Sequence, residues 1–150
     1  MEATNMNFIR AICLAVLLTA LVSSPTFAGE DLREKIDAGN QAFAAALLDG
    51  DVDSAVSSYT DTACVIAPSA DNACGKEQIK AFWTGVVDSG VKNIKIDTRE
   101  VGSSGDLAYA VGTLIVTDST DVDHASRDTL VFKKVAGEWK LHIDTWTPTR

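Results

Sequence analysis

The hydrophobic period of this chain changes near Gly90, and this change restricts the folds that the chain can adopt. Before Gly90 the apolar residues recur at helical spacing, most clearly between Ile79 and Val87, where they follow an i, i+3, i+4, i+7, i+8 pattern. After Gly90 they alternate with period two in segments separated by turns. Helices followed by strands predict an α+β domain in which N-terminal helices pack on an antiparallel sheet.

The ends of these segments are marked by capping and turn residues. Asp51 is a good N-cap, because its carboxylate can accept a hydrogen bond from a free amide of the first helical turn. Gly50 and Gly90 follow helical segments and predict helix ends. The expected helices span residues 30–49, 51–59 and 75–89. The expected strands span residues 64–68, 91–101, 107–118, 127–135 and 138–147.

The last expected strand alternates strictly, so its two faces can be assigned from the sequence. Side chains on a strand point alternately to opposite sides, which places Trp139, Leu141 and Ile143 on one face, predicted to be the core face. The opposite face carries Lys140, His142, Asp144 and Trp146. A single inserted residue, a β-bulge, would change this assignment for the residues that follow it.

The first 28 residues predict a secretory signal peptide. Arg10 precedes an apolar run over residues 11–22, and small residues before Ala28 match the pattern of a cleavage site after Ala28. A membrane anchor is the alternative, but the run is shorter than the roughly 20 apolar residues that span a bilayer. We therefore expect a secreted or periplasmic protein, with no membrane association after cleavage and one domain at residues 29–150.

The net charge argues against one class of partner. The chain has a formal charge of −8 at pH 7 and a pI near 4.6. An acidic surface repels the phosphate backbone of DNA and RNA, so we expect no nucleic-acid partner.

Two cysteines, Cys64 and Cys74, remain after the expected cleavage, and they flank a turn-like segment around Pro68. In an oxidising compartment this arrangement favours a disulfide that closes a small hairpin. Two buried free thiols are the alternative. A redox role is not indicated, because the CxxC spacing is absent.

Three motifs, in this order, resemble the nuclear transport factor 2-like superfamily, and within it the ketosteroid isomerase homologues and SnoaL-like proteins. The motifs lie at residues 49–53 with 59–61, at residues 75–83, and at residues 137–141. The resemblance covers the whole chain after the signal peptide. It implies a cone-shaped fold in which a curved sheet wraps around the N-terminal helices, an open-ended apolar pocket, and a homodimer formed through the sheet.

The resemblance to steroid isomerases carries over at one of three catalytic positions. Their carboxylate base falls on Ala67 here, and their oxyanion tyrosine falls on Phe43, so both groups are missing. Their second oxyanion donor, an aspartic acid, falls on Asp128. SnoaL-like cyclases use an acid on the final strand, and that region matches His142 to Asp144.

Asp128 and the pair His142 and Asp144 are therefore the candidate catalytic residues. Asp128 shares a strand face with Leu130 and Phe132, and burial in an apolar site would raise the pKa of its carboxyl. A solvent-exposed aspartate at a strand end is the alternative. His142 and Asp144 share a face and could form an acid–base dyad, although alternation directs that face away from the core.

Aromatic side chains are the candidate walls of the pocket, because apolar binding sites are usually lined by aromatic residues with a few polar groups. The candidates are Phe43, Tyr59, Trp83, Tyr109 and Trp146. For Trp83 a plain core role is the alternative, and the two tyrosine hydroxyls could equally have structural partners. A metal site is not indicated, because His124 and His142 are the only histidines and no ligand spacing links them to a third residue.

These observations predict an exported protein that binds a small hydrophobic molecule in an apolar pocket. The first hypothesis is cofactor-free acid–base chemistry on a hydrophobic carbonyl compound, as in an isomerase or cyclase. The second is a non-catalytic module for binding, dimerisation or assembly. Burial of Asp128 or Asp144 at a cavity would favour the first hypothesis.

Overall fold

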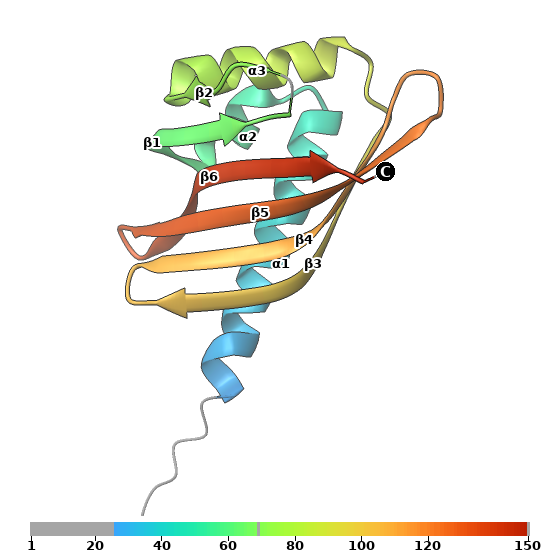
Figure 1. Ribbon diagram of the computed structural model, residues 1–150. Coiled ribbons are helices and arrows are strands. Elements are labelled where there is room, and N and C mark those ends of the chain that lie inside the picture. The colour runs from blue at the N-terminus through green and yellow to red at the C-terminus, as the bar shows by residue number, and fades with distance from the viewer. Residues whose placement is uncertain (1–25, 69, 150) are drawn as a thin grey trace, which may run out of the picture.

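The computed structural model describes residues 26–68 and 70–149 (Figure 1). Its elements follow the predicted order, in which one strand precedes the third helix, and a second strand of two residues that was not predicted also precedes that helix. The helices are α1 (Thr26–Leu48), α2 (Val52–Ser57) and α3 (Lys76–Asp88). The strands are β1 (Tyr59–Ile66), β2 (Ala73–Cys74), β3 (Asn93–Ser104), β4 (Leu107–Thr117), β5 (Asp123–Val135) and β6 (Glu138–Pro148). Most of the expected signal peptide lies outside the described residues, and the expected cleavage point after Ala28 falls in the first turn of α1.

All six strands form one curved sheet in the order β2-β1-β6-β5-β4-β3, and α1 lies across its inner face (Figure 1). The predicted α+β class is confirmed. Four of the strand pairs are antiparallel, as predicted, whereas β1 and β6 run parallel. A parallel pair needs a long connection, and here the whole segment from α3 to β5 separates the two strands along the chain.

The end of α2 differs from the expectation. Asp51 caps this helix as predicted, since its carboxylate accepts hydrogen bonds from the backbone amide of Ser54 at 3.0 Å and from its hydroxyl at 2.6 Å. The helix ends at Ser57, however, and Tyr59 is the first residue of β1 rather than part of the helix. This change of element directs Tyr59 into the core, where 1% of it is exposed.

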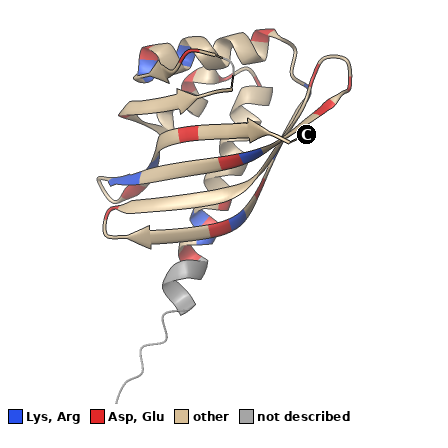
Figure 2. Ribbon diagram, viewed as in Figure 1, with Lys and Arg blue, Asp and Glu red and all other residues tan. Residues whose placement is uncertain are grey.

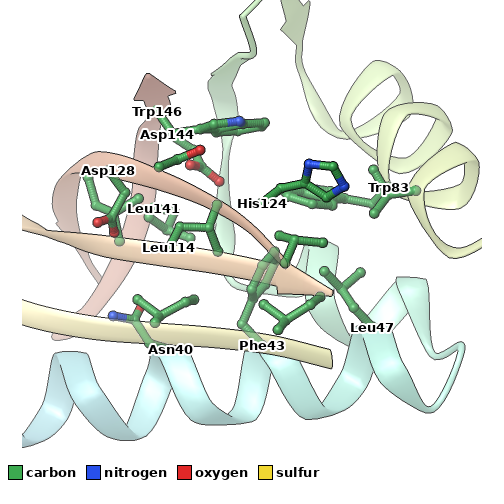
Figure 3. Close-up of a pocket in the computed structure, with 16 residues that line it drawn as sticks. Asn40, Phe43, Leu47, Trp83, Leu114, His124, Asp128, Leu141, Asp144 and Trp146 are labelled. Carbon is green, nitrogen blue, oxygen red and sulfur yellow. The ribbon is translucent and has the colours of Figure 1, made fainter. Parts of the chain in front are cut away.

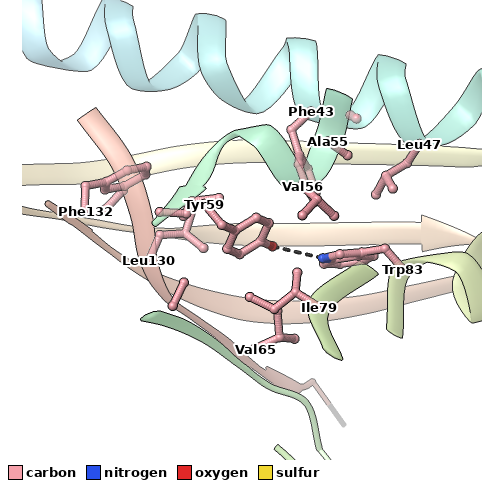
Figure 4. Packing of buried hydrophobic residues seen from close by; sticks show 14 of the residues in the cluster. Phe43, Leu47, Ala55, Val56, Tyr59, Val65, Ile79, Trp83, Leu130 and Phe132 are labelled. Carbon is pink, nitrogen blue, oxygen red and sulfur yellow. Dashed lines mark hydrogen bonds between the residues drawn. The ribbon is translucent and has the colours of Figure 1, made fainter. Parts of the chain in front are cut away.

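The core lies between α1, α3 and the inner face of the sheet (Figure 4). The rings of Phe43 and Trp83 meet edge to face at 5.1 Å, which joins the two helices. Arg33 fixes α1 to β3, because its guanidinium donates to the backbone oxygens of Thr98 at 2.7 Å and Arg99 at 2.6 Å. These acceptors lie at a bulge of β3, where the irregular pairing leaves carbonyl groups for the side chain.

The outer face of the sheet carries exposed apolar residues along β4. Leu107, Tyr109 and Val111 are 50%, 40% and 37% exposed, and this strand contains no charged residue (Figure 2). We call these three residues the β4 stripe. Among the described residues, no helix is both long enough and apolar enough to cross a membrane.

A disulfide joins Cys64 of β1 to Cys74 of β2, and the two cysteines are directly paired across the strands. It closes the short segment that contains Pro68. The amide of Cys74 also donates to Gln78 at 3.0 Å, which connects β2 to the first turn of α3. The bond therefore fixes the edge of the sheet against α3.

Candidate functional site

A cavity of about 270 Å³ lies between α1, α3 and the inner face of the sheet (Figure 3). Its walls are mainly apolar and include Leu47 of α1 and Leu114 of β4. Five lining residues carry polar or ionisable side chains, namely Asn40, His124, Ser126, Asp128 and Asp144, and two tryptophans, Trp83 and Trp146, also line the cavity. A mostly apolar cavity with few polar groups is typical of a site for a small molecule.

Asp128 is buried on the wall of this cavity, 5% exposed, and its Oδ1 atom has no hydrogen-bond partner among the described residues. Burial raises the pKa of this carboxyl, and the nearby charge of Asp97 raises it further. The space for the carboxyl comes from Gly112, which is paired with Asp128 on β4. A Cβ atom at Gly112 would lie 3.0 Å from Oδ1 of Asp128 and would contact the backbone oxygen of Asp97.

Asp144 also lines the cavity, which corrects the predicted faces of β6. The pairing of β5 with β6 is interrupted by a bulge, since Phe132 pairs with Leu141 and Val131 pairs with Ile143. His142 is the extra residue, so the faces exchange after it. Leu141 and Asp144 both point inward, whereas Ile143, predicted in the core, is only partly buried.

Tyr59 holds the Asp144 carboxylate from behind the cavity. The Tyr59 hydroxyl donates to Oδ2 of Asp144 at 2.5 Å and accepts a hydrogen bond from the indole nitrogen of Trp83 at 3.1 Å (Figure 4). Burial raises the pKa of Asp144 to about 6, although the hydrogen bond from Tyr59 opposes this rise. Burial and the Asp144 charge raise the pKa of Tyr59 well above its usual value, so Tyr59 stays a donor.

The two acids interact across neighbouring strands. Asp128 is paired with Trp146 and Leu130 with Asp144, so Asp128 and Asp144 are diagonal neighbours on the inner face. Diagonal positions on paired strands lie roughly 7 to 8 Å apart. The charge of Asp128 contributes to the raised pKa of Asp144. Two buried acids at this spacing can hold or exchange protons with one molecule placed between them.

Three of the five predicted aromatic residues line the cavity. Phe43, Trp83 and Trp146 do so, and the rings of Trp83 and Trp146 are stacked with centroids 6.2 Å apart. Tyr59 lies behind the wall, where it contacts Asp144 instead of the cavity. Tyr109 was predicted at the pocket but lies on the outer face, where its hydroxyl donates to Glu100 at 2.7 Å. Strict alternation along β4 explains this, because its neighbours Ala108 and Ala110 face inward.

His142 is not part of the cavity, so the predicted dyad with Asp144 does not form. Its Nδ1 atom lies 2.9 Å from the hydroxyl of Thr60, on β1. Partial burial lowers the pKa of His142, and the charge of Lys133 lowers it further. The bulge turns this side chain away from the face that carries Asp144.

Three polar residues that line the cavity were not predicted from the sequence, namely Asn40, His124 and Ser126. Asn40 interrupts the apolar stripe of α1 one turn before Phe43, and this interruption was a usable signal. Its side-chain amide donates to the hydroxyl of Thr98 at 3.3 Å. His124 and Ser126 lie on the same strand face as Asp128, but they preceded the predicted start of that strand.

Asn40 and Asp128 lie toward one end of the cavity and His124 toward the other (Figure 3). Asp128 follows His124 by four positions on β5, which corresponds to roughly 13 Å along the strand. The Nε2 atom of His124 lies 2.8 Å from Oδ2 of Asp118, and the side chain is largely exposed. Among residues 26–68 and 70–149, no group of three potential ligand side chains is placed to bind a metal ion.

Solved structures with this fold are similar in shape and distant in sequence. A ketosteroid isomerase-like protein from Erwinia carotovora atroseptica superposes with a TM-score of 0.66 and 22% identity over 78% of this chain and 95% of its own. A nuclear transport factor 2-like protein of unknown function from Pseudomonas putida gives 0.65 and 20% identity over 80% and 85%. A nuclear transport factor 2-like protein with a cystatin-like fold from Novosphingobium aromaticivorans gives a TM-score of 0.68 and 15% identity over 83% of this chain and 90% of its own. These similarities establish the fold.

No curated protein matches the chain significantly in sequence. The model of the SnoaL-like domain family matches residues 36–143, which include Asp128 and most of the described chain and end one residue before Asp144. The chain therefore belongs to the SnoaL-like domain family, within the nuclear transport factor 2-like superfamily.

Proposed function

We propose that this protein binds a small hydrophobic carbonyl compound and catalyses a cofactor-free proton transfer on it, as an isomerase or cyclase does. The observation that carries the proposal is the pair of buried acids on one apolar cavity, of which one has an unpaired oxygen and the other is held by a buried tyrosine. Acids with raised pKa values in a cavity are candidates for acid–base catalysis.

Asp144 is the residue that exchanges the proton. Its carboxylate takes a proton from the carbon next to the carbonyl, which breaks a C–H bond, forms an O–H bond on Asp144 and leaves an enolate. Return of the proton to another atom of the same molecule completes an isomerisation without any net oxidation or reduction. A pKa of about 6 suits both halves of this cycle near neutral pH. Asp128, with its unpaired Oδ1, binds and orients the substrate.

Deuterium exchange tests this proposal. In D₂O we expect the protein to accelerate exchange at the carbon next to the carbonyl of phenylbutanone, followed by NMR, with a rate that rises with pH through about 6 as Asp144 ionises. Replacement of Asp144 by Asn should reduce the rate by about 100-fold or more. Asp106→Asn removes an equal charge from an exposed turn and should change little. No acceleration over buffer, or full activity in Asp144→Asn, would refute the proposal.

The second candidate function is a non-catalytic binding, dimerisation or assembly module. The β4 stripe favours a contact with another protein, since three adjacent exposed apolar residues on one sheet face are costly to leave in water. We propose that a second copy of the chain covers it, as the family resemblance implies. Dimerisation through the outer face leaves the cavity on the inner face free, so both functions can coexist.

We also propose that the protein is exported and acts in the periplasm or outside the cell. The apolar run over residues 11–22 and the disulfide between Cys64 and Cys74 support this location, because disulfides persist in oxidising compartments. Intact-mass measurement of the protein recovered from the periplasm or medium should give a chain that begins at Gly29. Recovery only of the uncleaved chain in the cytoplasm would contradict export.

A further inference from the structure

We propose that the ligand of the cavity carries a protonated amine on a hydrophobic body, and that the carboxylate of Asp128 is the counter-ion of this ammonium group. The inference concerns the class of molecule that binds, and it rests on the proposed function for the role of the second acid, Asp144.

Asp128 is buried, but one of its carboxyl oxygens has no hydrogen-bond partner among the described residues. The side chain is buried on the cavity wall, and Oδ1 accepts no hydrogen bond from the described residues. A buried polar atom without a partner costs free energy, so such atoms in proteins are usually paired with protein, water or ligand. Gly112 leaves the space that this carboxyl occupies, because a Cβ atom there would approach Oδ1 to 3.0 Å. An oxygen held in this way is suited to accept a hydrogen bond from a bound molecule.

The charges around Asp128 favour a positive donor over a neutral one. Its charged neighbours are themselves acids, since Asp97 raises the pKa of Asp128 and Asp128 raises that of Asp144. None of the described residues that line the cavity is a lysine or an arginine. Negative charge in a region of low dielectric is stabilised strongly by an adjacent cation. An ammonium group supplies both the missing donor and the missing positive charge.

The end of the cavity at His124 is also acidic. The turn between β4 and β5 carries Asp118 and Asp121, Asp123 begins β5, and Figure 2 shows acidic positions on this hairpin. Asp118 contacts His124 at the cavity, whereas Asp121 is paired with Lys92 at 2.7 Å. A field of this sign attracts cations and repels anions as they approach. It therefore disfavours carboxylates, phosphates and other anionic ligands.

The aromatic walls suit the same ligand. Trp83, Trp146 and Phe43 line the cavity, and their rings also pack against one another. Tryptophan faces attract ammonium groups and also bind apolar bodies through dispersion. A volume of about 270 Å³ accommodates one small apolar molecule with a single polar end. The inner cluster of Asn40, Asp128 and Asp144 then receives the amine, and the apolar body extends toward His124 (Figure 3).

Binding measurements with four probes of one apolar body test the inference. The probes are phenylbutylamine, phenylbutanol, phenylbutanone and phenylbutyrate, which differ only in the polar end. By calorimetry at neutral pH we expect the amine to bind the wild-type protein at least about tenfold more tightly than the alcohol and the ketone, and the carboxylate to bind most weakly. Equal affinities for amine and alcohol, tighter binding of phenylbutyrate, or no binding of any probe would overturn the inference.

Asp128→Asn keeps the size of the side chain and removes its charge. We expect this variant to lose the preference for phenylbutylamine over phenylbutanol, whereas Asp106→Asn should retain it. Because the preference is a ratio within one protein, a general loss of stability does not imitate this result. Retention of the preference in folded Asp128→Asn would overturn the inference. If Asp128→Asn does not fold, the ranking of the four probe affinities on the wild-type protein tests the inference by itself.

The same protein preparations separate this inference from the proposed function. Tight binding of the amine without any deuterium exchange would support the ligand class and refute catalysis. Exchange on phenylbutanone that depends on Asp144, together with no preference for the amine, would support catalysis and refute the ligand class. The two proposals therefore fail on different measurements.

Discussion

At the scale of single residues, Asp144 differs most clearly from an ordinary solvent-exposed aspartate. Its pKa is raised from 3.8 to about 6 because the carboxyl is buried. When the pKa of a group is higher in the folded than in the unfolded protein, its protonated form stabilises the fold. This stabilisation is complete at pH values below the unfolded-state pKa, and it is lost as the pH rises through the folded-state pKa. Two units of pKa correspond to roughly 3 kcal/mol. Asp144 therefore destabilises the fold at neutral pH, as expected of a residue retained for function.

Asp144→Asn should accordingly raise the free energy of unfolding at neutral pH, by up to about 3 kcal/mol, and should give no gain near the unfolded pKa of 3.8. The hydroxyl of Tyr59 can still donate to the amide oxygen of the new side chain. Thermal and urea unfolding across this pH range measure the difference. Asp106→Asn is the control, because its carboxyl lies on an exposed turn. An equal stability difference at all pH values would contradict this account of Asp144.

A substitution at Gly112 tests how closely the carboxyl of Asp128 is packed. Gly112→Ala should destabilise the protein by about 1 to 3 kcal/mol, since the new methyl group meets Oδ1 of Asp128 and the backbone of Asp97. Gly85→Ala is the matched control, because a Cβ atom on this helical residue of α3 meets nothing within 4 Å. Alanine is favoured over glycine in a helix, so the control should be neutral or stabilising. Chemical unfolding that ranks the two variants in the opposite order would contradict the packing described at Gly112.

At the scale of secondary structure elements, the edge of the sheet depends on the disulfide. Removal of both cysteines, as Cys64→Ala with Cys74→Ala, should lower the free energy of unfolding by about 2 to 3 kcal/mol, because the unfolded chain gains freedom. Urea unfolding measures the change. A reducing agent should destabilise the wild-type protein and leave the double variant unaffected. Equal sensitivity of both proteins to the reducing agent would contradict a role for this bond.

The sequence predicted the elements better than their register. Caps and glycines such as Asp51 and Gly90 have local physical effects, and they located the helix ends within a few residues. The bulge at His142 has no local signal, because it depends on how β6 pairs with β5 and β1. One extra residue exchanged the faces, so Asp144 entered the cavity and Ile143 left the core. Asp128 was predictable because no bulge interrupts its pairing with β4.

The residues of the site that depend on contacts between distant elements were the hardest to predict from the sequence. Tyr59 was expected at the pocket wall and instead supports Asp144 from behind, since it begins a strand rather than ending a helix. Its partner lies 85 positions away in the sequence. Asn40 and His124 reach the cavity from α1 and β5, and a one-dimensional pattern does not show that these elements meet. Contacts of this kind follow from the tertiary fold alone.

At the scale of the whole molecule, the outer face of the sheet predicts the oligomeric state. We expect the wild-type protein to be a dimer in light scattering coupled to gel filtration, and Val111→Lys to shift it to monomer, because a charge in the β4 stripe resists burial. Thr84→Lys is the control, since it adds the same side chain to the exposed side of α3. A monomeric wild-type protein would contradict the proposed dimer and leave the cavity chemistry unaffected.

Asp128 and Asp144 share one cavity, and Tyr59 controls the pKa of Asp144 through its hydrogen bond. Carbon-13 NMR titration of the aspartate carboxyl groups in the wild-type protein and in Tyr59→Phe tests this arrangement. We expect Asp144 to titrate near 6 and Asp128 above its ordinary value. We also expect Tyr59→Phe to raise the pKa of Asp144 further, because the lost hydrogen bond favoured the charged form, whereas Tyr109→Phe should leave it unchanged. Ordinary pKa values near 4 for both acids, or no response to Tyr59→Phe, would contradict the account.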